Sequence, residues 1–280
     1  MTLTTAPAAP APSAAPRGAW SWIPARLRKD PLAARLAVIA LAFVAWEVAG
    51  HTVFDTDFIS PPSAILMAAP RVLGDPDVLV ALWASFYQLV VAFVISLVAG
   101  VLVGAPIGLS RFTTRSLLPL ILLAYSIPQV TVLPLFVLWF GIGSATKIAF
   151  GVSHGIFPII LNVIAGAQTI DEAHLKAARS MGATRAQILR RVVLPHMTPS
   201  LFAGLRLGMS ATLLGVLLAE LYVSTGGIGF YTKLFSESFD PPATFTLVAC
   251  LALMAILLNE TVRRAEKRAS FWRNDGTNEK

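Results

Sequence analysis

The segment DEAHLKAARSMGATRAQILRRVVLP, residues 171–195, is a polar and basic stretch that lies between two long apolar segments. A connection that only joins two membrane-spanning helices needs about two to eight residues, and this one has 25. Its composition favours amphipathic helix over flexible spacer. We therefore expect a folded element outside the membrane that a partner recognises.

The rest of the chain is too apolar for a water-soluble domain. Of 280 residues, 56% are hydrophobic and 13% are charged, and the mean hydropathy is +0.71. A run of about 20 apolar residues crosses a bilayer. The sequence predicts an all-α membrane protein with six transmembrane helices, in a permease domain of residues 31–268 whose 169–196 loop connects spans four and five. The six apolar runs are residues 33–53, 84–109, 116–140, 146–168, 199–222 and 242–261.

The distribution of lysine and arginine predicts the topology, because these residues accumulate in short loops on the cytoplasmic side. They are frequent in the 169–196 loop, near both termini and after the second span, whereas the opposite connections hold only Arg71, Lys147 and Lys233. We therefore expect both termini and the loop in the cytoplasm, with residues 1–30 as a disordered tail and residues 269–280 as a second tail. The net charge of +7 is mostly this orientation signal and implies no nucleic-acid partner.

Local rules predict two short helices in the loop. Gly182 is expected to end the first helix in a left-handed conformation, and Pro195 is expected to stop the second. Each helix is expected to begin with a capping box, in which Ser or Thr is followed three residues later by Glu or Gln. The two pairs are Thr169 with Glu172 and Thr184 with Gln187.

Two of the spans are interrupted by proline. Lipid offers no replacement hydrogen bonds, so broken helices in membranes usually face protein or a water-filled path. Ser126 and Gln129 lie within this interrupted region, which makes them candidates for a pathway wall. The alternative is that the prolines only kink the helices. The prolines are Pro119, Pro128, Pro134 and Pro158.

Span two carries Gly100, Gly104 and Gly108 at four-residue spacing. One face of this helix is therefore nearly bare backbone, which another helix can approach closely. We expect the neighbour to come from the same chain rather than from a second copy.

Ionisable groups inside a span need a partner or a polar cavity, because burying a charge there costs a few kcal/mol or more. Glu220 ends the apolar run of span five and precedes the glycine-rich segment STGGIGF, residues 224–230. It is interpreted either as a pathway or gate carboxylate near the periplasmic end, or as an interfacial carboxylate that binds the loop. His154 is likewise either a pathway group or a packing residue. Ser126, Gln129, His154 and Glu220 are the candidate pathway residues.

No HExxH, GxSxG, P-loop or metal-spaced Cys/His cluster occurs in the sequence. We therefore expect no catalytic residue, no metal and no cofactor. The chain also has no nucleotide site of its own, so its energy source must be another subunit or an ion gradient.

A family resemblance rests on KAARSMGATRAQILRRVVLP, residues 176–195, which is similar to the EAA motif of the membrane subunits of ABC importers. Gly182 matches the spaced glycine of that motif, and Leu194 with Pro195 matches its apolar end. The resemblance covers about residues 30–270. Further stretches resemble the nitrate, sulfonate and taurine branch: FISPPSAI (58–65), PLFVLWFGIGSATKI (134–148), FPIILN (157–162) and AELYVSTGGIGF (219–230).

The resemblance implies a type I ABC importer permease in the bacterial inner membrane. Such a permease pairs with a second copy of itself, two cytoplasmic ATP-binding subunits and a periplasmic or lipid-anchored binding protein. The loop is then the coupling helix that docks on the ATPase. Lys176 departs from the motif, which usually has Glu there, and Glu172 lies one turn earlier, where it can pair with Lys176 or substitute for it. The implied coupling residues are Glu172, Lys176, Ala177, Ala178, Arg179, Gly182, Ala183, Leu194 and Pro195.

The implied activity is import of a small anion, such as an aliphatic sulfonate, taurine or nitrate, by alternating access. ATP is hydrolysed by a partner, so the chain itself is not expected to be an enzyme. Alternatives are a permease of the same branch for a thiamine precursor or riboflavin, and a gradient-driven secondary transporter. An intramembrane enzyme is disfavoured by the lack of paired catalytic groups. A nucleic-acid-binding helix-turn-helix in the loop is disfavoured because its connections leave no room for a separate three-helix domain.

Overall fold

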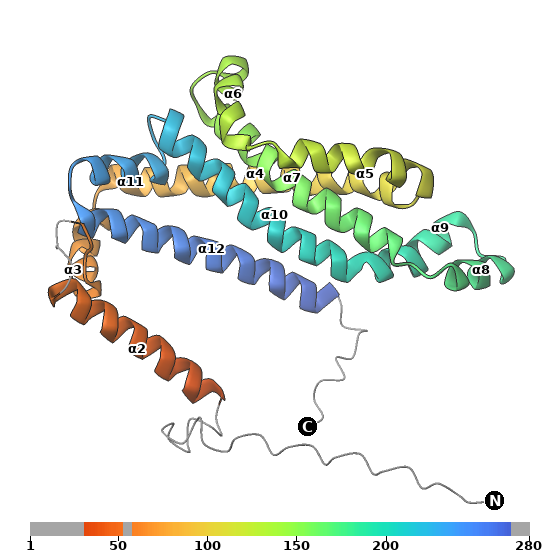
Figure 1. Ribbon diagram of the computed structural model, residues 1–280, viewed down its shortest axis with the longest axis horizontal. Helices are drawn as coiled ribbons and strands as arrows, with labels where there is room; N and C mark the ends of the chain where they lie inside the picture. Colours follow the sequence, from red (N-terminus) through yellow and green to blue (C-terminus); the bar gives the residue numbers. More distant parts are fainter. Residues whose placement is uncertain (1–30, 53–57, 270–280) are drawn as a thin grey trace, which may run out of the picture. The chain divides into compact units, whose positions relative to one another are not determined.

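The computed structural model describes residues 31–52 and 58–269, which form helices and short connections and, within those ranges, no strand (Figure 1). The chain divides into two compact units, Met1–Asp55 and Thr56–Lys280. In the first unit the described part is α2 (Pro31–Thr52), an apolar helix long enough to cross a membrane. The tail predicted at residues 1–30, and residues 270–280 of the second tail, lie outside the described residues.

The second unit is a bundle of long helices with shorter helices at its ends. It comprises α3 (Pro62–Leu73), α4 (Pro76–Gly108), α5 (Arg111–Ser126), a 3-10 turn η1 (Gln129–Val132), α6 (Leu133–Phe140), α7 (Ser144–Gln168), α8 (Glu172–Ser180), α9 (Arg185–Ile188), a π-helical turn η2 (Leu189–Val193), α10 (Leu194–Val223), α11 (Ile228–Glu237) and α12 (Pro241–Ala269).

The predicted all-α membrane fold is confirmed. Within the described residues five helices are long and apolar enough to span a membrane, and the α5–α6 pair, bent by 78°, makes a sixth span if it is counted as one. The break falls at Ile127 and Pro128, which are both extended. Proline disfavours helical conformation in the residue before it and has no N–H to donate, so the chain turns at this point.

Helix α7 lies between α4 and α10 and contacts both over most of its length. On the α4 side, the glycine face meets branched and small side chains of α7. The expectation that the neighbouring helix belongs to the same chain is confirmed, because the three glycines contact α7. Gly100 faces Ile159, Gly104 faces Val163, and Gly108 faces Ala167 and the backbone of Ile164.

The α7–α10 contact uses glycines on both helices. Gly155 of α7 faces Thr212, and Gly208 of α10 faces Ile159 and the carbonyl of Gly155. Small residues let the backbones approach closely, which is how helices associate where lipid removes most of the hydrophobic driving force. Around this contact Leu89 and Val163 are almost completely buried.

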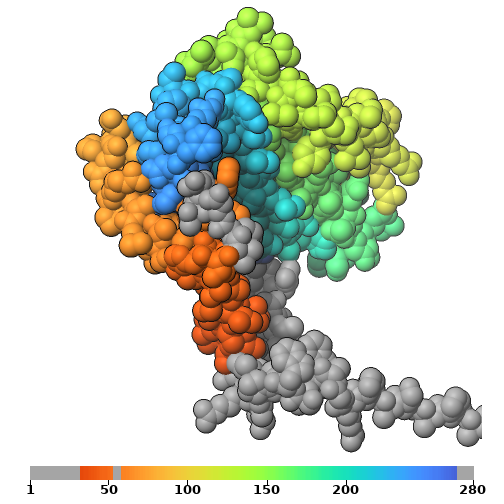
Figure 2. All heavy atoms as spheres, turned by 60° about the vertical axis from the view of Figure 1, so that its left-hand side comes forward, coloured from red at the N-terminus to blue at the C-terminus, as the bar shows by residue number. Residues whose placement is uncertain are grey.

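At the opposite end from α8 and α9, the helices α3 and α11 pack against α12 (Figure 1). Figure 2 shows α3, in orange, beside the blue surface of α11 and α12. Val72, Ile228 and Leu247 are fully or almost fully buried between them. A salt bridge of 2.7 Å joins Arg71 of α3 to Asp240, just before α12. This end of the bundle is thus held together by both apolar and charged contacts.

A substitution at the α4–α7 contact tests this packing. Alanine at Gly108 would place its Cβ 2.7 Å from the Ala167 Cβ and 2.9 Å from the Ile164 Cα. We expect Gly108→Ala to destabilise the bundle by about 1–3 kcal/mol, the usual cost of overpacking, and to lower the thermal midpoint of the detergent-solubilised protein. The matched control is Gly226→Ala, whose Cβ meets nothing within 4 Å. Equal midpoints for the two variants would contradict the close contact.

Candidate functional site

The loop between α7 and α10 begins with a different helix cap from the one predicted. Asp171 caps α8, and its carboxylate accepts a hydrogen bond of 2.8 Å from the Ala173 N–H. The predicted capping box of Thr169 with Glu172 is wrong, because the Thr169 hydroxyl donates to the Gly166 carbonyl at 2.9 Å and lies 3.3 Å from His196 Nε2. Thr169 therefore ends α7 and connects the start of the loop to His196 at its end.

The predicted turn at Gly182 is confirmed. Gly182 has φ +75°, in the left-handed region, and a Cβ built there would meet nothing within 4 Å. The N–H groups of Gly182 and Ala183 donate to the carbonyls of Arg179 and Ala178 at 2.9 and 3.1 Å. These hydrogen bonds pair carbonyl groups in the last turn of α8 that have no partner within the helix, as is common where a helix ends at glycine.

The second capping box is also confirmed. The Thr184 hydroxyl accepts from the Gln187 N–H at 3.3 Å, and the Gln187 side chain accepts from the Thr184 N–H at 2.8 Å. The predicted stop at Pro195 is wrong, because the helix continues from Arg185 to Val223. The wider π turn of Leu189–Val193 precedes the proline, and Pro195 falls in the first turn of α10, where it is tolerated.

Charged groups on the loop form exposed ion pairs. Glu172 accepts from Arg111 at 2.5 Å and lies 3.9 Å from Lys176 Nζ, so the predicted i, i+4 pair with Lys176 is present. All three side chains are more than half exposed. Exposed pairs of this kind contribute little to stability, so these groups remain available to a partner.

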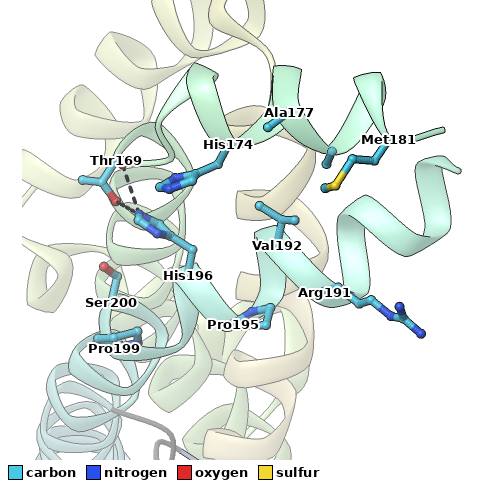
Figure 3. A pocket seen from close by; sticks show the side chains of 11 residues that line it. Thr169, His174, Ala177, Met181, Arg191, Val192, Pro195, His196, Pro199 and Ser200 are labelled. Carbon is cyan, nitrogen blue, oxygen red and sulfur yellow. Dashed lines mark hydrogen bonds between the residues drawn. The ribbon is translucent and has the colours of Figure 1, made fainter. Parts of the chain in front are cut away.

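The loop surrounds an open cavity of about 730 Å³ (Figure 3). Met181, the residue after α8, and Val192 of the π turn line it together with His174 and His196. Met181 is 81% exposed, whereas Ala178, three residues earlier, is buried. An exposed methionine beside an apolar hollow is typical of a binding surface that adapts to its partner.

The predicted coupling residues are mostly on the surface of this loop. Ala183 and Pro195 are half-buried and Ala178 is buried. The exposed ones are Glu172, Lys176, Ala177, Arg179, Gly182 and Leu194.

The structure brings together two of the four predicted pathway residues. Ser153 links them, since its hydroxyl lies 3.5 Å from Gln129 Oε1 and 3.4 Å from His154 Nδ1. His154 is buried, lies 3.0 Å from the Phe150 carbonyl and stacks edge-on against the Phe150 ring. Ser126 is exposed and its hydroxyl donates to the carbonyl of Leu123.

The fourth predicted pathway residue, Glu220, lies in a separate cluster and is completely buried. It accepts from the Ser85 hydroxyl at 2.6 Å and from the Gly229 N–H at 2.9 Å. Ser85 in turn accepts from the Ile228 N–H at 2.8 Å. The carboxylate therefore fastens the start of α11 to α4 and α10.

Sequence reasoning missed three polar residues at this end of the bundle. Ser85 and Gln88 lie on α4, and Lys147 lies in the first turn of α7. Lys147 is 6% exposed and donates to the Gly226 carbonyl at 2.6 Å. Lys147 is the only Lys, Arg, Asp or Glu between Arg115 and Asp171, and this isolation was the one available signal. Within the described ranges no group of three His, Cys, Asp or Glu side chains is placed to hold a metal ion.

Comparison with known proteins gives the class of the chain. Residues 96–268 match the family described as binding-protein-dependent transport system inner membrane component. The chain belongs to this family of ABC importer permeases, as its sequence motifs had indicated.

Two relatives and one solved structure illustrate the relationship. The taurine transport system permease protein TauC of Escherichia coli is 31% identical over 84% of this chain and 87% of that protein. The formylaminopyrimidine transport permease protein ThiX of Halalkalibacterium halodurans is 26% identical over 83% and 93%. An inward-facing structure of the MetNI methionine ABC transporter aligns with a TM-score of 0.59 at 19% identity, covering 70% of this chain and 99% of that one. This likeness shows the type I permease fold.

The buried carboxylate can be tested directly. Glu220→Ala leaves the Ser85 hydroxyl and the Gly229 N–H without their partner, and each buried unsatisfied group costs about 1–3 kcal/mol. We expect a lower thermal midpoint and faster proteolysis at the turn of residues 224–227. Glu237→Ala is the matched control, because Glu237 is exposed and, within the part of the chain that the structure describes, pairs only with Lys233, at 3.7 Å. If the two variants unfold at the same temperature, Glu220 does not hold this turn.

Proposed function

We propose that this chain is the membrane-spanning subunit of an ATP-driven importer that moves a small anion, an aliphatic sulfonate, taurine or nitrate, by alternating access. The observation that carries the proposal is the polar 169–196 loop. It continues directly into α10 and presents Met181 and its charged neighbours to a partner. Family membership supports an ATP-driven importer, and the likeness to a taurine permease favours a small anion as the substrate.

The assembly that we propose contains two copies of this chain, two ATP-binding subunits and a binding protein outside the membrane. Many large apolar side chains of the second unit are exposed, among them Leu102, Leu138 and Ile256. Such surfaces suit lipid or a second permease copy. We place the loop and both termini in the cytoplasm, because basic residues are concentrated there.

The coupling mechanism follows from how the loop is attached. Nucleotide-driven closure of the ATP-binding subunits would displace α8, whose left-handed end at Gly182 fixes its direction relative to α9. The displacement passes through the π turn into α10, which contacts α7 along its length. We propose that the spans then switch between outward- and inward-facing states, with Gln129 and His154 on the pathway.

Uptake by the reconstituted complex tests the function. We expect ATP-dependent accumulation of labelled taurine, ethanesulfonate or nitrate in proteoliposomes that contain the permease, its ATP-binding subunits and its binding protein. Formylaminopyrimidine serves as the competing substrate class, because a relative is named for it. Uptake that continues without ATP and collapses with a proton uncoupler would refute an ATP-driven importer, and uptake of formylaminopyrimidine alone would refute the anion.

The turn at Gly182 tests the coupling role. Valine at φ +75° is strained, at a cost of about 1–2 kcal/mol, although the space around its Cβ is open. We expect Gly182→Val to keep the complex in the membrane and to reduce uptake about tenfold, the factor that about 1.4 kcal/mol represents. ATP hydrolysis should then no longer respond to substrate.

Gly141→Val is the matched control, because Gly141 has φ +72° and equally open space but lies at the end of α6. Normal uptake by Gly182→Val, or an equal loss in both variants, would contradict the coupling role.

A further inference from the structure

A second cavity, of about 370 Å³, lies at the end of α7 and α10 that is remote from the 169–196 loop. Helix α7 has 25 residues, so the two sites are separated by about 37 Å at 1.5 Å per residue. Gln88 of α4, Ser144 and Lys147 of α7 and the turn of residues 224–227 line this cavity. None of these groups belongs to the coupling surface described above.

Two buried polar side chains in the cavity wall have unused hydrogen-bonding capacity. Gln88 is 3% exposed, and its Nε2 donates to the Ser144 hydroxyl at 3.1 Å while its Oε1 has no partner. Turning the amide over would pair the oxygen with Ser144 and leave the nitrogen alone, so one polar atom is unpaired in either orientation. A buried polar atom without a partner destabilises the fold unless something binds it.

Lys147 is the second of these groups. An ammonium has three N–H donors, and among the described residues one is used, by the Gly226 carbonyl at 2.6 Å. Lys147 forms no salt bridge within residues 31–52 and 58–269. A buried ammonium at the end of a span is expensive unless it meets an anion or a polar cavity.

The nearby carboxylate of Glu220 attracts the Lys147 ammonium, but among the described residues the two groups form no salt bridge. Its two oxygens are directed at the Ser85 hydroxyl and the Gly229 N–H, beneath the turn at Gly227. Glu220 is not among the residues that line the cavity, whereas Lys147 and Gln88 both are. Asp77 also lines it but is exposed and sits at the start of α4.

From this geometry we infer that the cavity of Gln88, Ser144 and Lys147 is an anion-binding subsite that receives the anionic oxygens, those of a sulfonate or of nitrate, of the transported solute. Lys147 donates to the anionic oxygens. The Gln88 amide, turned over so that its oxygen accepts from the Ser144 hydroxyl, leaves its NH2 group free to donate to the anion as well. The inference rests on the proposed function for the identity of the solute. It explains why a charge and an unpaired amide are both buried at this end.

The test uses the full-length chain in membrane vesicles, with its lone cysteine removed by Cys250→Ala and a new thiol placed in the cavity wall by Thr225→Cys. The rate of thiol modification is compared for a sulfonatoethyl and a trimethylammonioethyl methanethiosulfonate of similar size. Lys147 should favour the sulfonate reagent. Lys147→Met should lower the ratio of the two rates about tenfold, because one charge is lost a few ångströms away, and Lys147→Arg should preserve it.

Protection of the Thr225→Cys thiol by added anions distinguishes a binding site from a purely electrostatic preference for one reagent. Ethanesulfonate or nitrate should slow modification saturably, whereas the uncharged dimethyl sulfone should not. Gln88→Leu should abolish saturable protection while leaving the charge preference, because it removes a contact and no charge. Lys233→Met is the matched control, since Lys233 is a lysine at the same end of the bundle that pairs with Glu237 outside the cavity.

The subsite is overturned if no anion protects, if Lys147→Met leaves the rate ratio unchanged, or if neither reagent reaches Thr225→Cys. Should Lys147→Met fail to insert, protection in the parent Thr225→Cys chain decides the question alone. These measurements need no transport, no ATP and no binding protein. A protein that shows saturable anion protection but no ATP-driven uptake would therefore refute the proposed function and keep the subsite.

Discussion

The close approach of α7 to α4 on one side and to α10 on the other is the constraint on which the bundle depends. In lipid, helices gain little from hiding apolar surface, and association relies on close contact between backbones. Glycines such as Gly104 and Gly208 make that contact, with Val163 and Ile159 seated against them. Because α7 packs against α4 on one face and α10 on another, both of its ends are held in place. One end adjoins the 169–196 loop, and the other adjoins the polar cluster of Ser85, Lys147 and Glu220.

Features that depend on neighbouring residues in the chain could be predicted from the sequence. The left-handed turn at Gly182 and the capping box of Thr184 with Gln187 arise from three or four adjacent residues, and both are present. The choice of Asp171 over Thr169 as the first cap was missed, because both residues can cap a helix and His196, brought close by the fold, binds Thr169.

Features that depend on distant residues could not be predicted. The helix continues through Pro195 because a π turn absorbs the irregularity, and no local pattern announces such a turn. Ser85 and Glu220 are 135 positions apart, and Lys147 meets Gly226 across 79. Glu220 was singled out as an ionisable group at the end of a span, but its partners are set by how α4, α10 and α11 pack together.

The length of α10 has a mechanical meaning. Its 30 residues form a rod about 45 Å long at 1.5 Å per residue, and α9 is inclined to it beyond the π turn (Figure 1). Tilting α10 by about 10° around its midpoint would carry each tip through about 4 Å in opposite directions, by the same geometry. One tip bears the polar loop and the other bears the glycine turn that Lys147 holds. In the coupling mechanism that we propose, a tilt of α10 about its contact with α7 would therefore move the two ends in opposite directions.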